Sequence, residues 1–200
     1  MRLRDPIWRF ALRALAWLAP CFVLWYLAAP WYDRPAGWLA RILIDLWRDG
    51  VVDSVEYQAR LVTFVTSLEV QSQGGIGRLV LEVNPLLYGF GAPLLMALLL
   101  ASRARWTKIA LGLVVLIPFQ AWGIAFDALT QVLRDAPGLA PRAGLTGLRA
   151  EVAALAYQLG SLILPTLVPV VLWVVWQRPF IEAELLSRAA ASPPPPPSGA

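Results

Sequence analysis

Few residues in this chain have the chemistry that catalysis requires. The 200 residues include no histidine and one cysteine, which excludes Cys-His and Ser-His nucleophile pairs, histidine zinc sites and the commonest general base. Cys21 lies inside an apolar segment, where a desolvated thiol is unreactive. The sequence therefore predicts no catalytic residue, no metal site, no cofactor and no enzymatic activity.

Three polar side chains remain as candidates because they lie in or beside long apolar segments. Hydrocarbon penalises polar groups, so such residues mark either a substrate path or contacts between helices. Gln120 is about eleven residues into its segment, near mid-depth at about 1.5 Å per residue, and we expect it to hydrogen-bond a neighbouring helix at Gln158. Asp127 lies roughly 28 Å along that segment, where we expect a carboxylate that is solvated or paired with Arg134 or Arg149.

Membrane-spanning helices must position these residues. Hydrophobic residues make up 58% of the chain and charged residues 15%, whereas a soluble domain carries about 25% charged residues. A helix needs roughly 20 residues to cross the hydrocarbon. The sequence predicts a mainly α-helical membrane protein with four transmembrane helices, near Leu12–Pro30, Leu86–Ser102, Ile109–Phe126 and Val152–Trp176.

Basic residues set the topology of these spans. The short loop between the second and third spans carries Arg103, Arg105 and Lys108 without an acid, and short basic loops stay cytoplasmic. Arginines before the first span and Arg178 after the fourth then place both termini in the cytoplasm. The first span also has the charge pattern of a signal peptide, but Pro30 directly after its candidate cleavage site favours a retained helix. The arginines form no basic block, so we expect no nucleic-acid partner.

On this topology the chain divides into cytoplasmic, spanning and extracytoplasmic parts. Residues 127–151 are rich in Gly and Pro and predict a mostly irregular outer loop. The proline run near the C-terminus predicts a disordered tail. The parts are 1–30 (N-terminal segment and first helix), 31–85 (extracytoplasmic module), 86–126 (transmembrane hairpin), 127–151 (outer loop), 152–177 (fourth helix) and 178–200 (cytoplasmic tail).

The module between the first two spans predicts an amphipathic helix followed by a β-hairpin. Apolar residues recur at helical spacing from Trp38 to Trp47. This helix can lie flat in the outer leaflet or cover the module's own sheet, and the sequence leaves both open. Alternation from Val55 to Thr66 predicts a strand, Gln71–Gly77 a turn, and Gly77–Val83 the returning strand. The candidate interaction or packing residues are Trp38, Trp47, Tyr57, Gln120, Asp127 and Gln158.

Two stretches give the chain a resemblance to a known family. Residues 82–93 read EVNPLLYGFGAP and residues 118–123 read PFQAWG. With the overall layout, they resemble the small membrane proteins associated with exosortases, in particular exosortase H, over about Trp8 to Ile181. Exosortases are multi-span, transpeptidase-like enzymes that process exported proteins with cysteine, arginine and histidine. This chain departs from that pattern because it has no histidine and no cysteine on its outer face.

The resemblance implies an accessory in a protein-sorting system of a Gram-negative inner membrane. Its implied partners are the lipid bilayer and either an exosortase-like integral membrane protein or the exported substrate of that enzyme. Two other classes make different demands on the sequence. A small transporter or channel protomer needs a polar path, for which Gln120, Gln158 and Asp127 are the available material. A membrane enzyme needs an acid, base or nucleophile cluster that the sequence does not contain.

Overall fold

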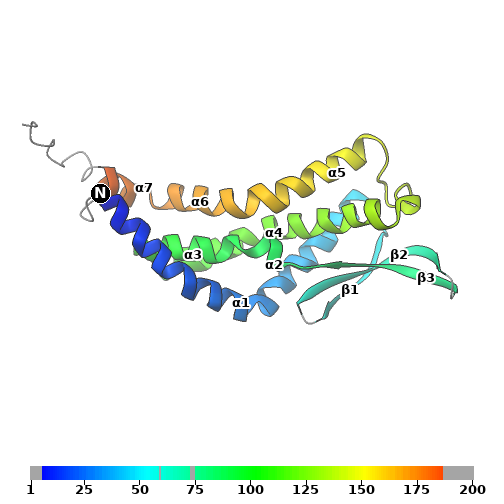
Figure 1. The fold of residues 1–200 in the computed structure, drawn as a ribbon, viewed down its shortest axis with the longest axis horizontal. Helices are drawn as coiled ribbons and strands as arrows, with labels where there is room; N and C mark the ends of the chain where they lie inside the picture. The colour runs from blue at the N-terminus through cyan, green and yellow to red at the C-terminus, as the bar shows by residue number, and fades with distance from the viewer. Residues whose placement is uncertain (1–5, 59, 73–74, 187–200) are drawn as a thin grey trace, which may run out of the picture.

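The computed structural model describes residues 6–58, 60–72 and 75–186. Within them the chain forms a mainly helical protein with a small sheet near one end of the helices (Figure 1), which confirms the predicted class. The predicted proline-rich tail and Gly74 of the predicted turn lie outside the described residues. Three described helical stretches are long and apolar enough to cross a membrane: Pro6–Trp47, Trp106–Asp135 and Leu148–Trp176.

Helix α1 (Pro6–Trp47) is one helix of 42 residues that unites the predicted first span with the predicted amphipathic helix. The expected break at Pro30 is wrong. A proline removes one backbone hydrogen bond and bends a helix, and Figure 1 shows α1 bent along its length. The helix resumes because its buried side chains continue at helical spacing on both sides, as Ala29, Ala36 and Ile44.

The next helices form the centre of the bundle. Helices α2 (Leu86–Gly89) and α3 (Gly91–Ala101) make up a shorter apolar stretch where the second span was predicted. Helix α4 (Trp106–Asp135) continues well past the predicted end at Phe126. The expectation of an irregular outer loop is therefore wrong for residues 127–135, because Ala128, Leu129 and Val132 are buried in the core.

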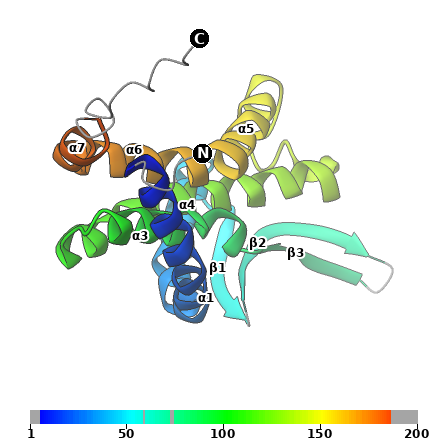
Figure 2. The same cartoon turned by 60° about the vertical axis from the view of Figure 1, so that its left-hand side comes forward.

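A short 3-10 turn and two joined helices complete the bundle. After η1 (Pro137–Leu139), helix α5 (Leu148–Gln158) continues through the π-helical segment η2 (Leu159–Ile163) into α6 (Leu164–Trp176). The short helix α7 (Arg178–Phe180) and the π-helical segment η3 (Ile181–Leu186) follow. Figures 1 and 2 show α7 beside the start of α1. We call the end of the bundle that holds α7 and the start of α1 the basic end, and the end that holds the sheet the sheet end.

The sheet has three antiparallel strands in the order β1 (Val52–Gln58), β2 (Leu61–Ser72) and β3 (Gly75–Val83). The prediction of a two-stranded hairpin is wrong, because the chain reverses between Gln58 and Leu61, which pair with each other. Across this reversal the positions that share one face switch from odd to even, because Tyr57 pairs with Val62 and Val55 with Phe64. One continuous alternating strand would not make this switch.

The buried side chains form two separate cores along the bundle. The mixed core lies between the sheet, the second half of α1, the end of α4 and the start of α5, and contains Ile44, Phe64 and Leu129. The helical core lies between the first half of α1, α3 and the start of α4, with α6 packed against it, and contains Trp25 and Leu95. The sheet is thus part of a folded unit at one end of the helices.

Candidate interaction site

An open groove lies between the β2–β3 hairpin and the end of α4. Its volume is about 530 Å³. Val70, Ile76 and Leu139 give it an apolar lining, and Ile76 is 72% exposed. An open groove with apolar and charged side chains together suits the surface of a polypeptide better than an enclosed small molecule. The charged residues that line it are Glu69, Asp135 and Arg142.

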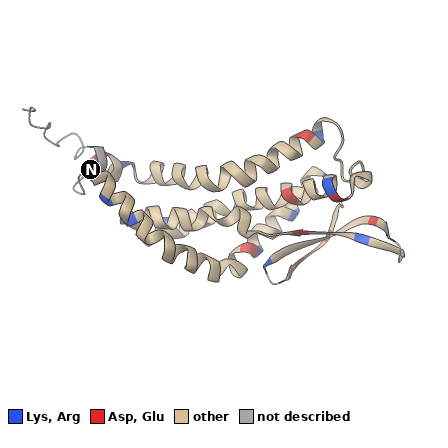
Figure 3. Cartoon of the chain, viewed as in Figure 1, with Lys and Arg blue, Asp and Glu red and all other residues tan. Residues whose placement is uncertain are grey.

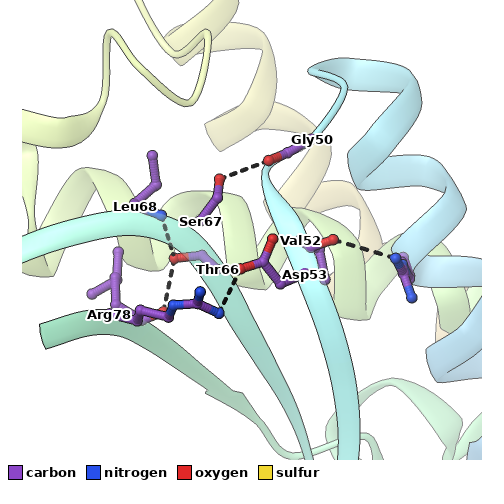
Figure 4. A network of polar contacts seen from close by, with 9 residues as sticks. Gly50, Val52, Asp53, Thr66, Ser67, Leu68 and Arg78 are labelled. Atoms are coloured by element: carbon purple, nitrogen blue, oxygen red, sulfur yellow. Dashed lines mark hydrogen bonds and ion pairs between the residues drawn. The ribbon is translucent and has the colours of Figure 1, made fainter.

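Polar contacts hold the hairpin in the position that forms this groove (Figure 4). The pairing of β2 with β3 shifts register between Val65 and Glu69, which bends the hairpin locally. Within this irregular stretch, the Thr66 hydroxyl donates to the Leu79 carbonyl oxygen at 2.8 Å. Arg78 on β3 forms an ion pair with Asp53 on β1, also at 2.8 Å. All three strands are therefore tied together at the base of the projecting part of the hairpin.

The sheet is fastened to α1 near Pro30 by the turn between β1 and β2. Arg60, in the turn between β1 and β2, donates from Nη1 to the Tyr26 carbonyl oxygen at 3.2 Å. Its guanidinium carbon lies 3.5 Å from the centroid of the Tyr26 ring. Pro30, four residues after Tyr26, has no N–H, so it leaves that carbonyl without its helical donor. Arg60 replaces the donor that Pro30 lacks.

Tyr57 makes a second contact between the sheet and α1. Its hydroxyl donates to the Arg34 carbonyl oxygen at 2.9 Å. Burial raises the pKa of Tyr57, while the nearby Arg34 cation acts in the opposite direction, so the phenol remains a donor at neutral pH. A Cβ at Gly37 would lie 2.9 Å from Tyr57 Cε1. Glycine at that position thus lets the tyrosine ring approach the helix.

Gln120 forms a buried polar pair that sequence reasoning missed. Its Nε2 donates to Asp33 Oδ1 at 2.7 Å and to the Pro85 carbonyl oxygen at 3.3 Å. The two side chains are 2% and 6% exposed, and Gln120 Oε1 has no partner among the described residues. The expected bond to Gln158 is wrong, because Gln120 faces α1 whereas Gln158 is exposed on α5.

This pair lies where the two cores meet. On α4, Gln120 follows Leu116 of the helical core and directly precedes Ala121 of the mixed core. On α1, Asp33 lies between Trp25 of the helical core and Ala36 of the mixed core. The pair therefore joins α1 to α4 at the boundary between the cores.

Asp127 lies on the mixed-core side of that boundary. The predicted pairing with Arg134 is confirmed, with 3.6 Å between Arg134 Nη2 and Asp127 Oδ1. The alternative of a solvated carboxylate is wrong, because Asp127 is buried. Its burial follows from the continuation of α4, which carries it into the folded sheet end.

The two predicted tryptophans of the module differ in environment. Trp47 packs edge-on against Phe126, with 5.6 Å between the ring centroids. Trp38 is 62% exposed. On the same part of α1, Ala36, Ala40 and Ile44 are buried in the mixed core. Of the two alternatives left open by the sequence, the helix that covers the module's own sheet is the one observed.

The sequence analysis did not predict Asp33 or Arg60 as contact residues. The sequence pattern contains a signal for Asp33 but none for Arg60. Asp33 stands four residues after Ala29 and four before Gly37, so it falls on the buried stripe once α1 is taken to continue through Pro30. Arg60 gave no such signal. Its role depends on a carbonyl of α1 that becomes a neighbour only through the tertiary fold.

The fold and these contacts define a multi-pass membrane protein with a folded sheet at one end of its helices. The described residues contain no group of three or more His, Cys, Asp or Glu side chains that could hold a metal ion. A family model described as Exosortase H-associated membrane protein matches residues 4–180. The chain belongs to this family, which confirms the resemblance. No curated protein and no solved structure matches the chain.

Proposed function

We propose that this protein is a non-catalytic accessory or scaffold of an exosortase sorting system. It contacts the membrane enzyme or the exported substrate of that enzyme through its sheet end. The observation that carries the proposal is the open groove with the exposed Ile76, held in shape by the Asp53–Arg78 ion pair. Membership of the exosortase H-associated family supports a role beside the sorting enzyme.

The proposed topology places the sheet end outside the inner membrane and both termini in the cytoplasm. Lys108, Arg103 and Arg178 lie at the basic end, where Lys108 Nζ donates to the Trp176 carbonyl oxygen at 2.8 Å. Figure 3 shows acidic and basic positions together toward the sheet end, so the orientation is inferred from the basic end. Termini that share one side require an even number of crossings. Leu86–Ala101 supplies the fourth, about 24 Å long at about 1.5 Å per residue.

Cysteine accessibility tests this topology. A cysteine in place of Ile76 should react with a membrane-impermeant thiol reagent applied from outside, whereas one in place of Thr107 should not. Both positions are exposed, so burial does not separate them. The opposite labelling pattern would show that the chain has the reverse orientation and would contradict the proposed topology.

The surroundings of Gln120 favour the accessory over the transporter alternative. Its amide is hydrogen-bonded to Asp33, and the void beside it has a volume of about 10 Å³, roughly room for a single water. Asp127 is paired with Arg134 and Gln158 faces outward. Gln120 thus contacts a second helix, Asp127 pairs within its own helix and Gln158 is exposed, so the three residues do not line a common path.

Affinity purification in mild detergent tests the contact itself. The wild-type chain should recover a multi-span sorting enzyme, identified by mass spectrometry. Ile76→Asp should reduce that recovery at least ten-fold, since it places a charge in the apolar groove. Leu46→Asp is the matched control, because Leu46 is similarly exposed but does not line the groove. Recovery of the chain only with itself, or equal recovery by both variants, would contradict the proposal.

A further inference from the structure

The β2–β3 hairpin extends beyond the first strand of its own sheet. Strand β2 has 12 residues, but its pairing with β1 ends at Val52 and Thr66. The next residue, Ser67, donates from its N–H to the Val51 carbonyl oxygen at 3.0 Å and from its hydroxyl to the Gly50 carbonyl oxygen at 2.6 Å. Figures 1 and 4 show β2 continuing past the start of β1. Within the described part of the chain, the rest of β2 therefore pairs with β3 alone.

The hairpin turn determines which main-chain groups of this part are free. Ser72 pairs with Gly75 across two loop residues, and the closing pair of such a hairpin exchanges hydrogen bonds. Bonded and non-bonded pairs alternate along an antiparallel ladder, so the N–H and carbonyl groups of Glu69 and Gln71 point away from β3. The N–H of Ser67 follows the same alternation, because it points to the β1 side. We call the main-chain groups of Glu69 and Gln71 the free edge of β2.

The free edge borders the groove. Glu69 belongs to this edge and also lines the groove, together with Val70 beside it. The opposite wall comes from the chain after α4, including Leu139 and Arg142. Among the described residues, no hydrogen bond joins the main chain of Glu69 to another element. The row beside β2 that β1 occupies up to Val52 is thus open at Glu69, and a groove of about 530 Å³ adjoins it.

A free strand edge selects its occupant by hydrogen bonding. Its donors and acceptors recur along one line, and an extended polypeptide carries the matching main-chain groups at the same spacing. An added strand would continue the row that β1 begins. Alternate side chains of that strand would lie on the face of Val70, which lines the groove. We infer that the free edge of β2 binds an extended segment of the exported substrate as an added strand.

Other sources of an extended segment fit the free edge less well. The proline run near the C-terminus follows Leu186 at the basic end, and proline has no N–H to donate to a ladder. A second copy that paired through the same edge would place two Glu69 carboxylates on one face of a small sheet, where like charges repel. The spanning helices of a sorting enzyme pair their main-chain groups internally. The choice of the exported substrate rests on the proposed function, which offers only the enzyme and its substrate as partners.

The other edge of the hairpin, on β3, provides a control position. The Glu82 carbonyl oxygen points outward on this edge and accepts from Gln131 Nε2 of α4 at 3.0 Å, so α4 covers part of it. By the same alternation, the N–H of Val80 also points outward, away from β2. Val80 is 47% exposed. It therefore matches Glu69 in its main-chain geometry but lies on the opposite edge.

Photo-crosslinking in native membranes tests the occupant. The probe is a tagged exported protein, chosen because it accumulates unprocessed when the sorting enzyme is deleted. A photo-reactive amino acid at Glu69 should crosslink to this protein, and one at Val80 should not. Adducts of the Glu69 position only with the enzyme, adducts only with a second copy, no protein adducts, or equal crosslinking from both positions would each overturn the inference.

Proline substitution tests the main-chain contacts directly. Glu69→Pro removes an N–H of the free edge but no hydrogen bond to β3, and edge strands tolerate proline at such positions. Recovery of the tagged protein in mild detergent should fall about ten-fold, because a main-chain hydrogen bond to the added strand is lost. Glu69→Ala, which keeps the N–H, and Val80→Pro should leave recovery unchanged, and equal melting temperatures check that the variants fold. Unchanged recovery by Glu69→Pro, or an equal loss in Glu69→Ala, would overturn the inference.

Amide hydrogen exchange of the wild-type chain tests the inference even if Glu69→Pro does not fold. The purified tagged protein should slow exchange of the Glu69 and Gln71 amides about ten-fold and leave the Arg78 amide, on the opposite edge, unchanged. Unchanged exchange at Glu69 would overturn the inference. If Ile76→Asp lowers recovery of the sorting enzyme while Glu69→Pro has no effect, the inference fails and the proposed function stands. If neither variant changes recovery, both fail.

Discussion

The mixed core and the helical core differ in the elements that they join. The mixed core buries side chains from strands and helices together, such as Phe64 and Ile44. The helical core joins helices alone, and helices approach closely at glycines beside it. A Cβ at Gly91 would lie 2.6 Å from the Pro165 carbonyl oxygen, and one at Gly112 would lie 2.7 Å from Leu95 Cδ2.

On the proposed topology the two cores lie in different solvents. In water, removal of apolar surface drives folding, so a small sheet is stabilised when it covers helices with large side chains. In lipid, that driving force between helices is absent, and helices associate by close van der Waals packing. On this proposal the helical core belongs to a membrane anchor and the mixed core to an outer unit, and the Asp33–Gln120 pair joins them.

Loss of the pair at this boundary should have the largest effect. Gln120→Leu leaves the buried Asp33 carboxylate with its hydrogen bond missing, so we expect a loss of about 3 kcal/mol in the free energy of unfolding. Asp33→Leu combined with Gln120→Leu should recover part of this loss, because both polar groups are then gone. Unfolding in detergent with increasing denaturant measures both variants.

Gln158→Leu is the matched control, since Gln158 is exposed and its replacement should change stability by less than about 0.5 kcal/mol. The double variant also separates the functional alternatives. If it folds and keeps its enzyme partner, Gln120 acts as a structural contact. Strictly additive losses from Asp33→Leu and Gln120→Leu would show that the two side chains do not interact.

Close packing in the helical core should give the next largest effect. Gly91→Ala places a methyl group against the backbone of Pro165, which cannot move aside as a side chain would. Overpacking of this kind costs about 1–3 kcal/mol and should exceed the gain of about 1 kcal/mol in helix propensity. The melting temperature in detergent should therefore fall. Gly138→Ala, with nothing within 4 Å of the added atom, should leave it unchanged, and equal melting temperatures would refute the close contact.

The sequence predicted the membrane anchor better than the outer unit. Apolar length and basic residues such as Lys108 are local signals, and they located the later helices near their observed positions. The fate of the chain at Pro30 depended on tertiary contacts. Asp33 becomes a partner of Gln120 only when α1 continues past this proline, and that continuation is stabilised by Arg60 from the sheet.

The sheet, too, could be predicted from the sequence only in part. Alternation of side chains detects extended chain, but the tight reversal between Gln58 and Leu61 shows only as a switch of the shared face from odd to even positions, which the apolar residues on both faces of β2 obscure. The sequence did not predict the groove either. It is formed by Ile76 on the hairpin and Leu139 after α4, which are distant in sequence and carry no motif.

Loss of the contact between the sheet and α1 should have the smallest effect on global stability, but it should lower the local stability of the β1–β2 turn. Arg60→Ala removes the donor to the Tyr26 carbonyl and the cation above its ring. Exposed contacts of these types contribute roughly 0.5–1 kcal/mol each, so global unfolding should change little. Hydrogen exchange should become faster in the amides near Gln58 and Leu61, because this turn loses its attachment to α1. Arg105→Ala, at the basic end, should leave that exchange unchanged. Exchange that stays slow in Arg60→Ala would mean that the other contacts, from Tyr57 to Arg34 and from Arg41 to Val52, hold the sheet to α1. The same measurement on Tyr57→Phe, which lacks the hydroxyl that bonds to Arg34, would then show the larger local change.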